Sequence, residues 1–93
     1  LNLSNNNLSS FPAILTLLQR LERLQLNEVG LAALPEIISR LTNLKQLEIA
    51  NNNLSTLPKN FSTLTKLCFL DIKENSISHL STFIEKLPNL QLL

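Results

Sequence analysis

The chain of 93 residues contains one glycine, one cysteine and one histidine, and it has no tryptophan, tyrosine or methionine. A single glycine excludes glycine-rich phosphate-binding loops, which need several backbone positions free of a Cβ atom. One cysteine cannot form an internal disulfide bond, and with one histidine it is too few for a zinc site. The composition therefore disfavours a nucleotide-binding enzyme and a metalloprotein, and we expect no cofactor and no metal.

Long apolar runs and an excess of one charge are also missing. No apolar stretch reaches the roughly 18 residues that a membrane span requires. Eight Lys and Arg residues nearly balance seven Asp and Glu residues, so no overall field attracts nucleic acid or an anionic membrane. We expect neither as a partner. The chain is nevertheless 44% hydrophobic, which excludes disorder, and leucine occupies 24 of its 93 positions.

These leucines form an internal repeat. Leu1, Leu24, Leu47, Leu70 and Leu93 follow one another at intervals of 23 residues and divide the chain into units 1–23, 24–46, 47–69 and 70–92. Repeat positions 1, 3, 8, 11, 15, 18 and 21 are apolar in all four units. No linker or low-complexity segment interrupts the pattern. Residues 1–93 are therefore expected to form one repeat array without an internal domain boundary.

The spacing inside each unit predicts its local structure. Positions 1 and 3 are apolar around a polar position 2, which is typical of a short strand with one buried face. An asparagine-rich turn follows, and then a proline at position 12 in three of the units. Positions 15, 18 and 21 suit a short 3₁₀ or α-helical return to the next strand. This predicts an α/β fold: a right-handed solenoid with a parallel sheet on its concave face and short helical or 3₁₀ segments on its convex face.

Two runs carry a family resemblance. Leu44-x-x-Leu47-x-Ile49-x-x-Asn52-x-Leu54 and its counterpart 23 residues later, from Leu67 to Ile77, match the leucine-rich-repeat signature. The 23-residue unit with Leu-Pro after the turn resembles the intracellular class found in Ras-suppressor-like scaffolds, LAP-type polarity proteins and Roco GTPase-kinases, and similar units occur in bacterial effectors. The resemblance implies a cytoplasmic protein or an effector delivered into a host cell.

Neither end of the repeat pattern carries a capping unit. Terminal repeats need a polar outer surface, because their core leucines otherwise face water. We therefore expect further repeats or caps on both sides, and we expect the 93 residues expressed alone to aggregate or to melt at a low temperature.

Candidate binding residues lie on the outward face, which we define as positions 2, 4 and 5 of each unit and the residue before position 1. Neighbouring side chains in such rows are about 4.8 Å apart. Four acidic and two basic residues fall on this face, hence −2, whereas the remaining six basic and three acidic residues give +3. The expected partner-binding residues are Arg23, Gln25, Glu28, Gln46, Glu48, Phe69, Asp71, Lys73 and Glu74.

Two features of this face allow more than one interpretation. Glu48 and Asp71 are lateral neighbours and could form a catalytic carboxylate pair, but an open sheet offers no pocket for catalysis. Two other interpretations are favoured: solvated charges whose mutual repulsion is reduced by Lys73, or an acidic stripe that binds a basic segment. Phe69, expected beside Leu92, is either an interface anchor or a single exposed apolar residue.

One step of the repeat breaks the asparagine pattern. Asn6, Asn52 and Asn75 occupy a position where a buried amide can satisfy loop backbone groups of two adjacent units, and the second unit has Val29 followed by Gly30 there. A loop remodelled for a partner would explain this change. A regular loop with one weaker step is the simpler explanation, and we expect it.

The sequence favours a non-catalytic protein–protein interaction module that binds a protein partner on its concave face and serves in scaffolding or signalling. If the concave face acts as an acidic stripe, the partner has a basic surface. No catalytic residues and no small-molecule substrate are expected. The alternative is the recognition segment of a larger enzyme, such as a Roco-type kinase or a bacterial ubiquitin ligase effector. Homodimerisation through the sheet or an exposed end is the third hypothesis.

Overall fold

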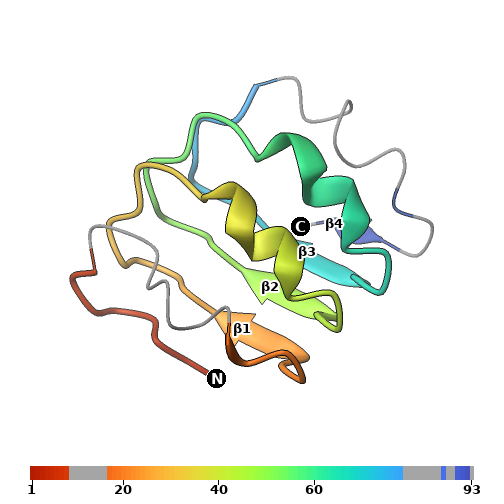
Figure 1. Cartoon of the computed structure of the whole chain (residues 1–93). Helices are drawn as coiled ribbons and strands as arrows, with labels where there is room; N and C mark the ends of the chain where they lie inside the picture. The colour runs from red at the N-terminus through yellow and green to blue at the C-terminus, as the bar shows by residue number, and fades with distance from the viewer. Residues whose placement is uncertain (9–16, 79–86, 88–89, 93) are drawn as a thin grey trace.

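The computed structural model describes residues 1–8, 17–78, 87 and 90–92, although not the side chain of Leu92. Within them the chain forms four short strands and two 3₁₀ helices: β1 (Arg23–Gln25), η2 (Glu36–Arg40), β2 (Gln46–Glu48), η3 (Lys59–Thr63), β3 (Phe69–Asp71) and β4 (Gln91–Leu92). The strands make one parallel sheet in the order β1-β2-β3-β4. Figure 1 shows η2 and η3 side by side against one face of this sheet.

The 23-residue interval sets the register of the first strand pairs. Leu24 pairs with Leu47, and Leu47 pairs with Leu70. A parallel bridge between Asn2 and Gln25 continues the sheet into the first unit. β1 and β2 are each followed by a return segment, containing η2 and η3 respectively, that crosses to the next parallel strand, as the spacing predicts.

The last strand pair departs from this interval. Leu70 pairs with Leu92 rather than with Leu93, and Phe69 pairs with Gln91. The backbone N–H of Gln91 donates to the carbonyl of Cys68 at 2.6 Å, which keeps the 23-residue interval of the bond from Cys68 to Lys45, so the shift of one residue lies in the strand pairing that follows. The expectation that Leu92 lies beside Phe69 is therefore wrong, because Gln91 takes that register position.

The hydrophobic core lies between the sheet and the 3₁₀ helices. All seven core positions predicted for the second and third units are buried: Leu24, Leu26, Leu31, Leu34, Ile38, Leu41, Leu44, Leu47, Ile49, Leu54, Leu57, Phe61, Leu64 and Leu67. Burial of each such side chain contributes about 1.5–3 kcal/mol before conformational entropy is subtracted. The leucines of repeat positions 1 and 18 are buried in these two units and exposed in the first unit.

Both 3₁₀ helices begin after a proline. Pro35 and Pro58 have φ of −71° and −64° with extended ψ, so each ends the preceding extended segment without leaving an unpaired N–H group. The N–H of Leu41 closes η2 on the carbonyl of Ile38, and Leu64 closes η3 in the same way. With three residues per turn, positions 15 and 18 face the core together. Of the corresponding segments 13–17 and 82–86 in the first and fourth units, the structure describes Leu17 alone.

A buried asparagine joins the loops of the second and third units. The Oδ1 atom of Asn52 accepts the backbone N–H groups of Val29 and Leu31 at 3.1 and 3.0 Å. Its Nδ2 atom donates to the carbonyl of Leu26 at 2.9 Å and to two carbonyls of its own unit. Asn75 repeats the arrangement one unit further with a single N–H donor. Each amide thus pairs polar groups that water reaches poorly.

The loop around Val29 is rearranged rather than regular, which corrects the expectation from the sequence. In the next two units the N–H at position 7 donates to the carbonyl at position 8 of the preceding unit, from Asn53 to Leu31 and from Ser76 to Leu54. In the second unit the direction is reversed, and Leu8 donates to the carbonyl of Val29 at 3.0 Å. Gly30 takes a left-handed φ of 79°, which no other position 7 among the described residues does.

The asparagine ladder supplies a first prediction. Replacing Asn52 with alanine leaves two N–H groups and up to three carbonyls without their partner, so the free energy of unfolding should fall by about 2–4 kcal/mol. Urea denaturation followed by circular dichroism measures this change. The neighbouring Asn53→Ala, at an exposed side chain, should stay within about 0.5 kcal/mol of the original protein.

The rearranged loop supplies a second prediction. Gly30→Ala should lower the free energy of unfolding by about 1 kcal/mol, because alanine disfavours the left-handed conformation. Val29→Asn should bring no gain, since the Leu8 N–H group already has an acceptor and a buried apolar side chain is lost. Thermal denaturation would report both changes, with Asn53→Ala at the same repeat position as the control. A raised midpoint for Val29→Asn would show that the loop is regular in solution.

Candidate functional site

The outward face is one open side of the sheet. Register places Asn2, Gln25, Glu48 and Asp71 in one lateral row. Among the described residues no helix or strand covers this side, whereas η2 and η3 lie on the other (Figure 1). Of the expected binding residues, Arg23, Glu28, Lys73 and Glu74 are exposed, and Gln25, Gln46, Glu48, Phe69 and Asp71 are half-buried.

Glu48 organises the centre of this face. Its Oε2 atom accepts hydrogen bonds from the side-chain amides of Gln25 at 2.9 Å and Gln46 at 2.8 Å, and its Oε1 atom accepts one from Asn27 at 3.1 Å. Hydrogen bonds to a carboxylate are shorter and stronger than those between neutral groups. The donors come from β1, from the turn after β1 and from β2 itself, so the carboxylate holds amides of two neighbouring units in fixed positions.

Asn27 is a member of the cluster that sequence reasoning did not select. Besides donating to Glu48, it accepts the backbone N–H of Ala50 on Oδ1 at 2.8 Å, and its own N–H donates to the hydroxyl of Ser4 at 2.9 Å. Asn27 therefore links the first three units. Asn27 occupies position 4 of its unit, which belongs to the outward face, and this position could have marked it as a candidate. The sequence does not indicate that its amide bridges neighbouring units.

Glu48 and Asp71 do not share a common partner. Asp71 accepts the backbone N–H of Lys73 on Oδ1 at 3.1 Å, which shapes the turn after β3. The Lys73 ammonium forms no ion pair with either carboxylate; the ion pair found among the described residues joins Lys45 and Glu22 at 3.5 Å, with both side chains largely exposed. The carboxylates are thus held by amides and by the backbone, without a direct ion pair to Lys73.

Glu28 and Glu74 occupy left-handed backbone positions. Their φ values are 54° and 56°, and the equivalent residues Asn5 and Asn51 have 63° and 56°. Asparagine tolerates this region far better than glutamate, which is disfavoured there by about 1 kcal/mol. Both glutamates are exposed, and their carboxylates accept no hydrogen bond from other described residues. At these two positions, glutamate therefore supplies a negative charge although asparagine would suit the left-handed backbone better.

Phe69 lies half-buried on β3, where register places it between Gln46 and Gln91. Its neighbours on both sides are therefore glutamines. An aromatic ring flanked by amides presents an apolar contact within a polar row, which is the usual composition of an interface anchor.

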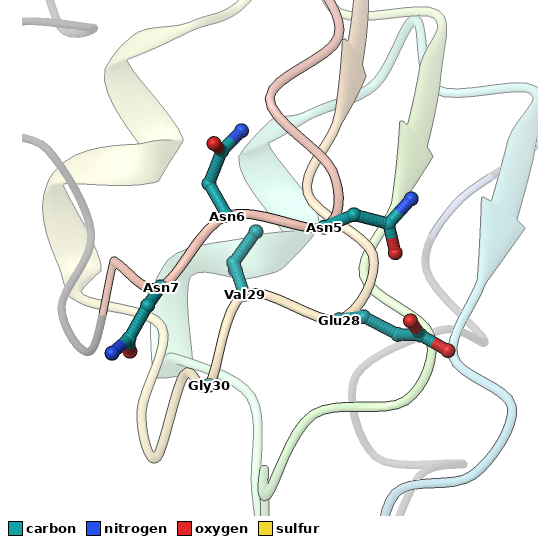
Figure 2. Close-up of a pocket in the computed structure, with 6 residues that line it drawn as sticks. All are labelled: Asn5, Asn6, Asn7, Glu28, Val29 and Gly30. Atoms are coloured by element: carbon teal, nitrogen blue, oxygen red, sulfur yellow. The ribbon is translucent and has the colours of Figure 1, made fainter.

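A shallow pocket of about 320 Å³ lies at the loops of the first two units (Figure 2). Its lining residues are Asn5, Asn6, Asn7, Glu28, Val29 and Gly30. It coincides with the rearranged loop, and no sequence pattern predicted it. Figure 2 shows Asn6 and Val29 pointing to the same side of the loops, away from Glu28. The pocket is open to solvent and mostly polar, unlike the enclosed apolar clefts that hold small molecules.

No metal or membrane site is apparent in the described part of the chain. No three His, Cys, Asp or Glu side chains there gather closely enough to hold a metal ion. None of the described helices has the length and apolar character to cross a membrane. Cys68 is exposed, with its thiol 3.3 Å from the carbonyl of Lys66. His79 lies outside the described residues.

The left-handed glutamates yield a third prediction. Glu28→Asn and Glu74→Asn should each raise the free energy of unfolding by about 0.5–1 kcal/mol, because asparagine suits the left-handed backbone. Chemical denaturation would measure the gain. Glu36→Asn makes the same side-chain change at a residue without a positive φ and should bring no such gain.

Comparisons with known proteins agree with the fold. A solved leucine-rich-repeat protein of Leptospira interrogans matches with a TM-score of 0.89 and 35% sequence identity over 98% of this chain. The chain covers 24% of that protein's length. No protein-family model matches, and a search of curated proteins also found no match. The parallel sheet, the asparagine-linked loops and this similarity together support a leucine-rich-repeat fold, a fold that typically serves as a non-enzymatic protein-interaction module.

Proposed function

We propose that the outward face binds a protein partner and has no chemistry of its own. The observation that carries the proposal is the uncovered sheet face on which Glu48 holds three amide side chains by hydrogen bonds of 2.8–3.1 Å. Side chains fixed before binding lose little conformational freedom when a partner docks. An open face of this kind suits recognition of another surface better than it suits catalysis, which needs a desolvated pocket.

The charges on the face favour a basic segment of the partner. Glu28 and Glu74 are exposed, and their carboxylates accept no hydrogen bond from the described residues; Asp71, three residues before Glu74, is half-buried. Arg23 and Lys73 oppose these charges only in part. Because the two glutamates occupy backbone positions that disfavour them, their charge is better explained by binding than by folding. Complementary charge would steer the encounter.

The finer architecture belongs to the same proposal. We infer four 23-residue units in a right-handed solenoid, with the outward face on its concave side, as in intracellular leucine-rich-repeat scaffolds of signalling. The second candidate is the recognition segment of a larger enzyme, and the structural neighbour, of which the chain covers 24%, is itself a longer protein. Sequencing the reading frame on both sides separates the two candidates, because an adjoining kinase or ligase domain would establish the second.

The charge of the outward face supplies a fourth prediction. Peptides selected from an unbiased displayed library for binding to the chain should carry a net positive charge. Glu74→Lys should slow their association by roughly 3–10-fold at low salt, with little effect at high salt, because exposed charges act mainly on encounter. Stopped-flow fluorescence would measure the rate. Glu36→Lys makes the same charge reversal on η2, on the other side of the sheet, and should change the rate less.

Phe69→Ala tests the anchor in the same assay. Loss of a buried contact should increase the dissociation rate about tenfold while association stays nearly constant. Equal effects of Glu74→Lys and Glu36→Lys, together with no effect of Phe69→Ala, would place the binding surface elsewhere.

A further inference from the structure

Four half-buried side chains lie together on the outward face, on two neighbouring strands. We call them the β2–β3 quartet, formed by Gln46 and Glu48 of β2 and by Phe69 and Asp71 of β3. Register pairs Gln46 with Phe69 and Glu48 with Asp71, and strand alternation turns all four side chains to the same side of the sheet. Their positions are about 4.8 Å apart across the strands and about 6.6 Å apart along them, so one head group of a partner can reach every member.

The quartet offers hydrogen-bond acceptors that no described residue uses. The Nε2 atom of Gln46 donates to Glu48 at 2.8 Å. Because an ionised carboxylate only accepts hydrogen bonds, this bond fixes which way the Gln46 amide is turned and leaves its Oε1 atom without a donor among the described residues. The Oδ1 atom of Asp71 accepts the backbone N–H of Lys73, whereas its Oδ2 atom accepts nothing from the described residues. A ligand for this site therefore has to donate hydrogen bonds to more than one side chain.

The quartet also carries two neighbouring negative charges that lack a paired cation. Among the described residues, the carboxylates of Glu48 and Asp71 form no ion pair, and the nearby Arg23 and Lys73 are exposed and pair with neither. Both carboxylates are half-buried, so water and salt screen their mutual repulsion less than on a fully exposed surface. A cation that approaches both of them is therefore attracted more strongly than it would be by either carboxylate alone.

We infer that the quartet recognises an arginine side chain of the partner, an inference that rests on the proposed binding of a protein to this face. A guanidinium group is planar and positively charged and has five N–H donors. It can lie on the ring of Phe69 and donate from its edge to Gln46 Oε1 and Asp71 Oδ2. Hydrogen bonds from Gln25 and Asn27 already hold the Glu48 carboxylate in place, so its charge is oriented before the arginine binds.

Lysine does not meet the same requirements. Its ammonium group is a compact, strongly hydrated charge with no flat surface to lay against the ring of Phe69. Its three donors diverge from a single nitrogen atom, whereas the free acceptors of Gln46 and Asp71 belong to different strands. The quartet should therefore distinguish two side chains of equal charge, which charge attraction alone cannot do.

Two small probes test the site without a known partner. N-acetyl-arginine methylamide and N-acetyl-lysine methylamide carry the same charge and differ in the head group. In an NMR titration at constant ionic strength, the arginine probe should shift the ring signals of Phe69 and the side-chain amide signals of Gln46 saturably. Its dissociation constant should be at least about fivefold below that of the lysine probe. The exposed side-chain amide of Asn53 should not shift. Equal dissociation constants, or no saturable shift with the arginine probe, overturn the inference.

Two variants separate recognition of the guanidinium from apolar contact and from charge. Phe69→Leu keeps an apolar side chain but removes the aromatic face, so the preference for the arginine probe should fall to about twofold or less. Glu74→Gln removes an exposed charge from the same face and should weaken both probes alike, which leaves their ratio unchanged. An unchanged ratio in Phe69→Leu contradicts stacking on the ring. If circular dichroism shows that Phe69→Leu does not fold, Gln46→Leu replaces it with the same expected loss of preference, because it removes a free acceptor.

The peptides selected from the displayed library distinguish failure of this inference from failure of the proposed function. Replacing arginine with lysine in a selected peptide should raise the dissociation constant about fivefold or more at one position at least. Basic peptides that depend on Glu74 but tolerate lysine at every arginine overturn the arginine site and leave the proposed function standing. If no selected peptide depends on Glu74 or Phe69, the proposed function fails, and the probe titration still supports or overturns the arginine site.

Discussion

The buried side-chain amide of the loop asparagine is the interaction on which the rest of the structure depends. Loops that turn away from a parallel sheet leave backbone N–H and carbonyl groups facing the core, where water cannot serve them. Asn52 satisfies such groups in two units at once. The leucines provide most of the stabilising free energy, and the amides of Asn52 and Asn75 join the second loop to the third and the third loop to the fourth.

The same repeat that constrains the core leaves the outward positions free. A side chain that points away from the leucines contributes little to folding, so its identity can follow another requirement. Glu48 uses this freedom to hold amides of neighbouring units, and Glu28 and Glu74 use it to carry charge despite an unfavourable backbone. Glu48 thus provides rigidity on the outward face, whereas Glu28 and Glu74 provide its free charge.

The sequence was sufficient for the pairing of β1, β2 and β3 and for the core of the second and third units, because both follow from apolar positions that recur at one interval. The sequence was insufficient where backbone and side-chain hydrogen bonds determine the local structure. The reversed bond at Val29 depends on whether Leu8 donates or accepts, and the amide cluster depends on how far Gln25, Asn27 and Gln46 reach. The pairing of Gln91 with Phe69 departs by one residue from the interval of the leucines. None of these choices changes the hydrophobic pattern, so none could be read from it.

The asparagine bonds between units join residues only 21 to 26 positions apart in the chain. Closing each loop therefore carries nearly the same entropic penalty, and no contact between distant parts of the chain has to form first. Folding can begin wherever two neighbouring units first meet and then extend outward one unit at a time.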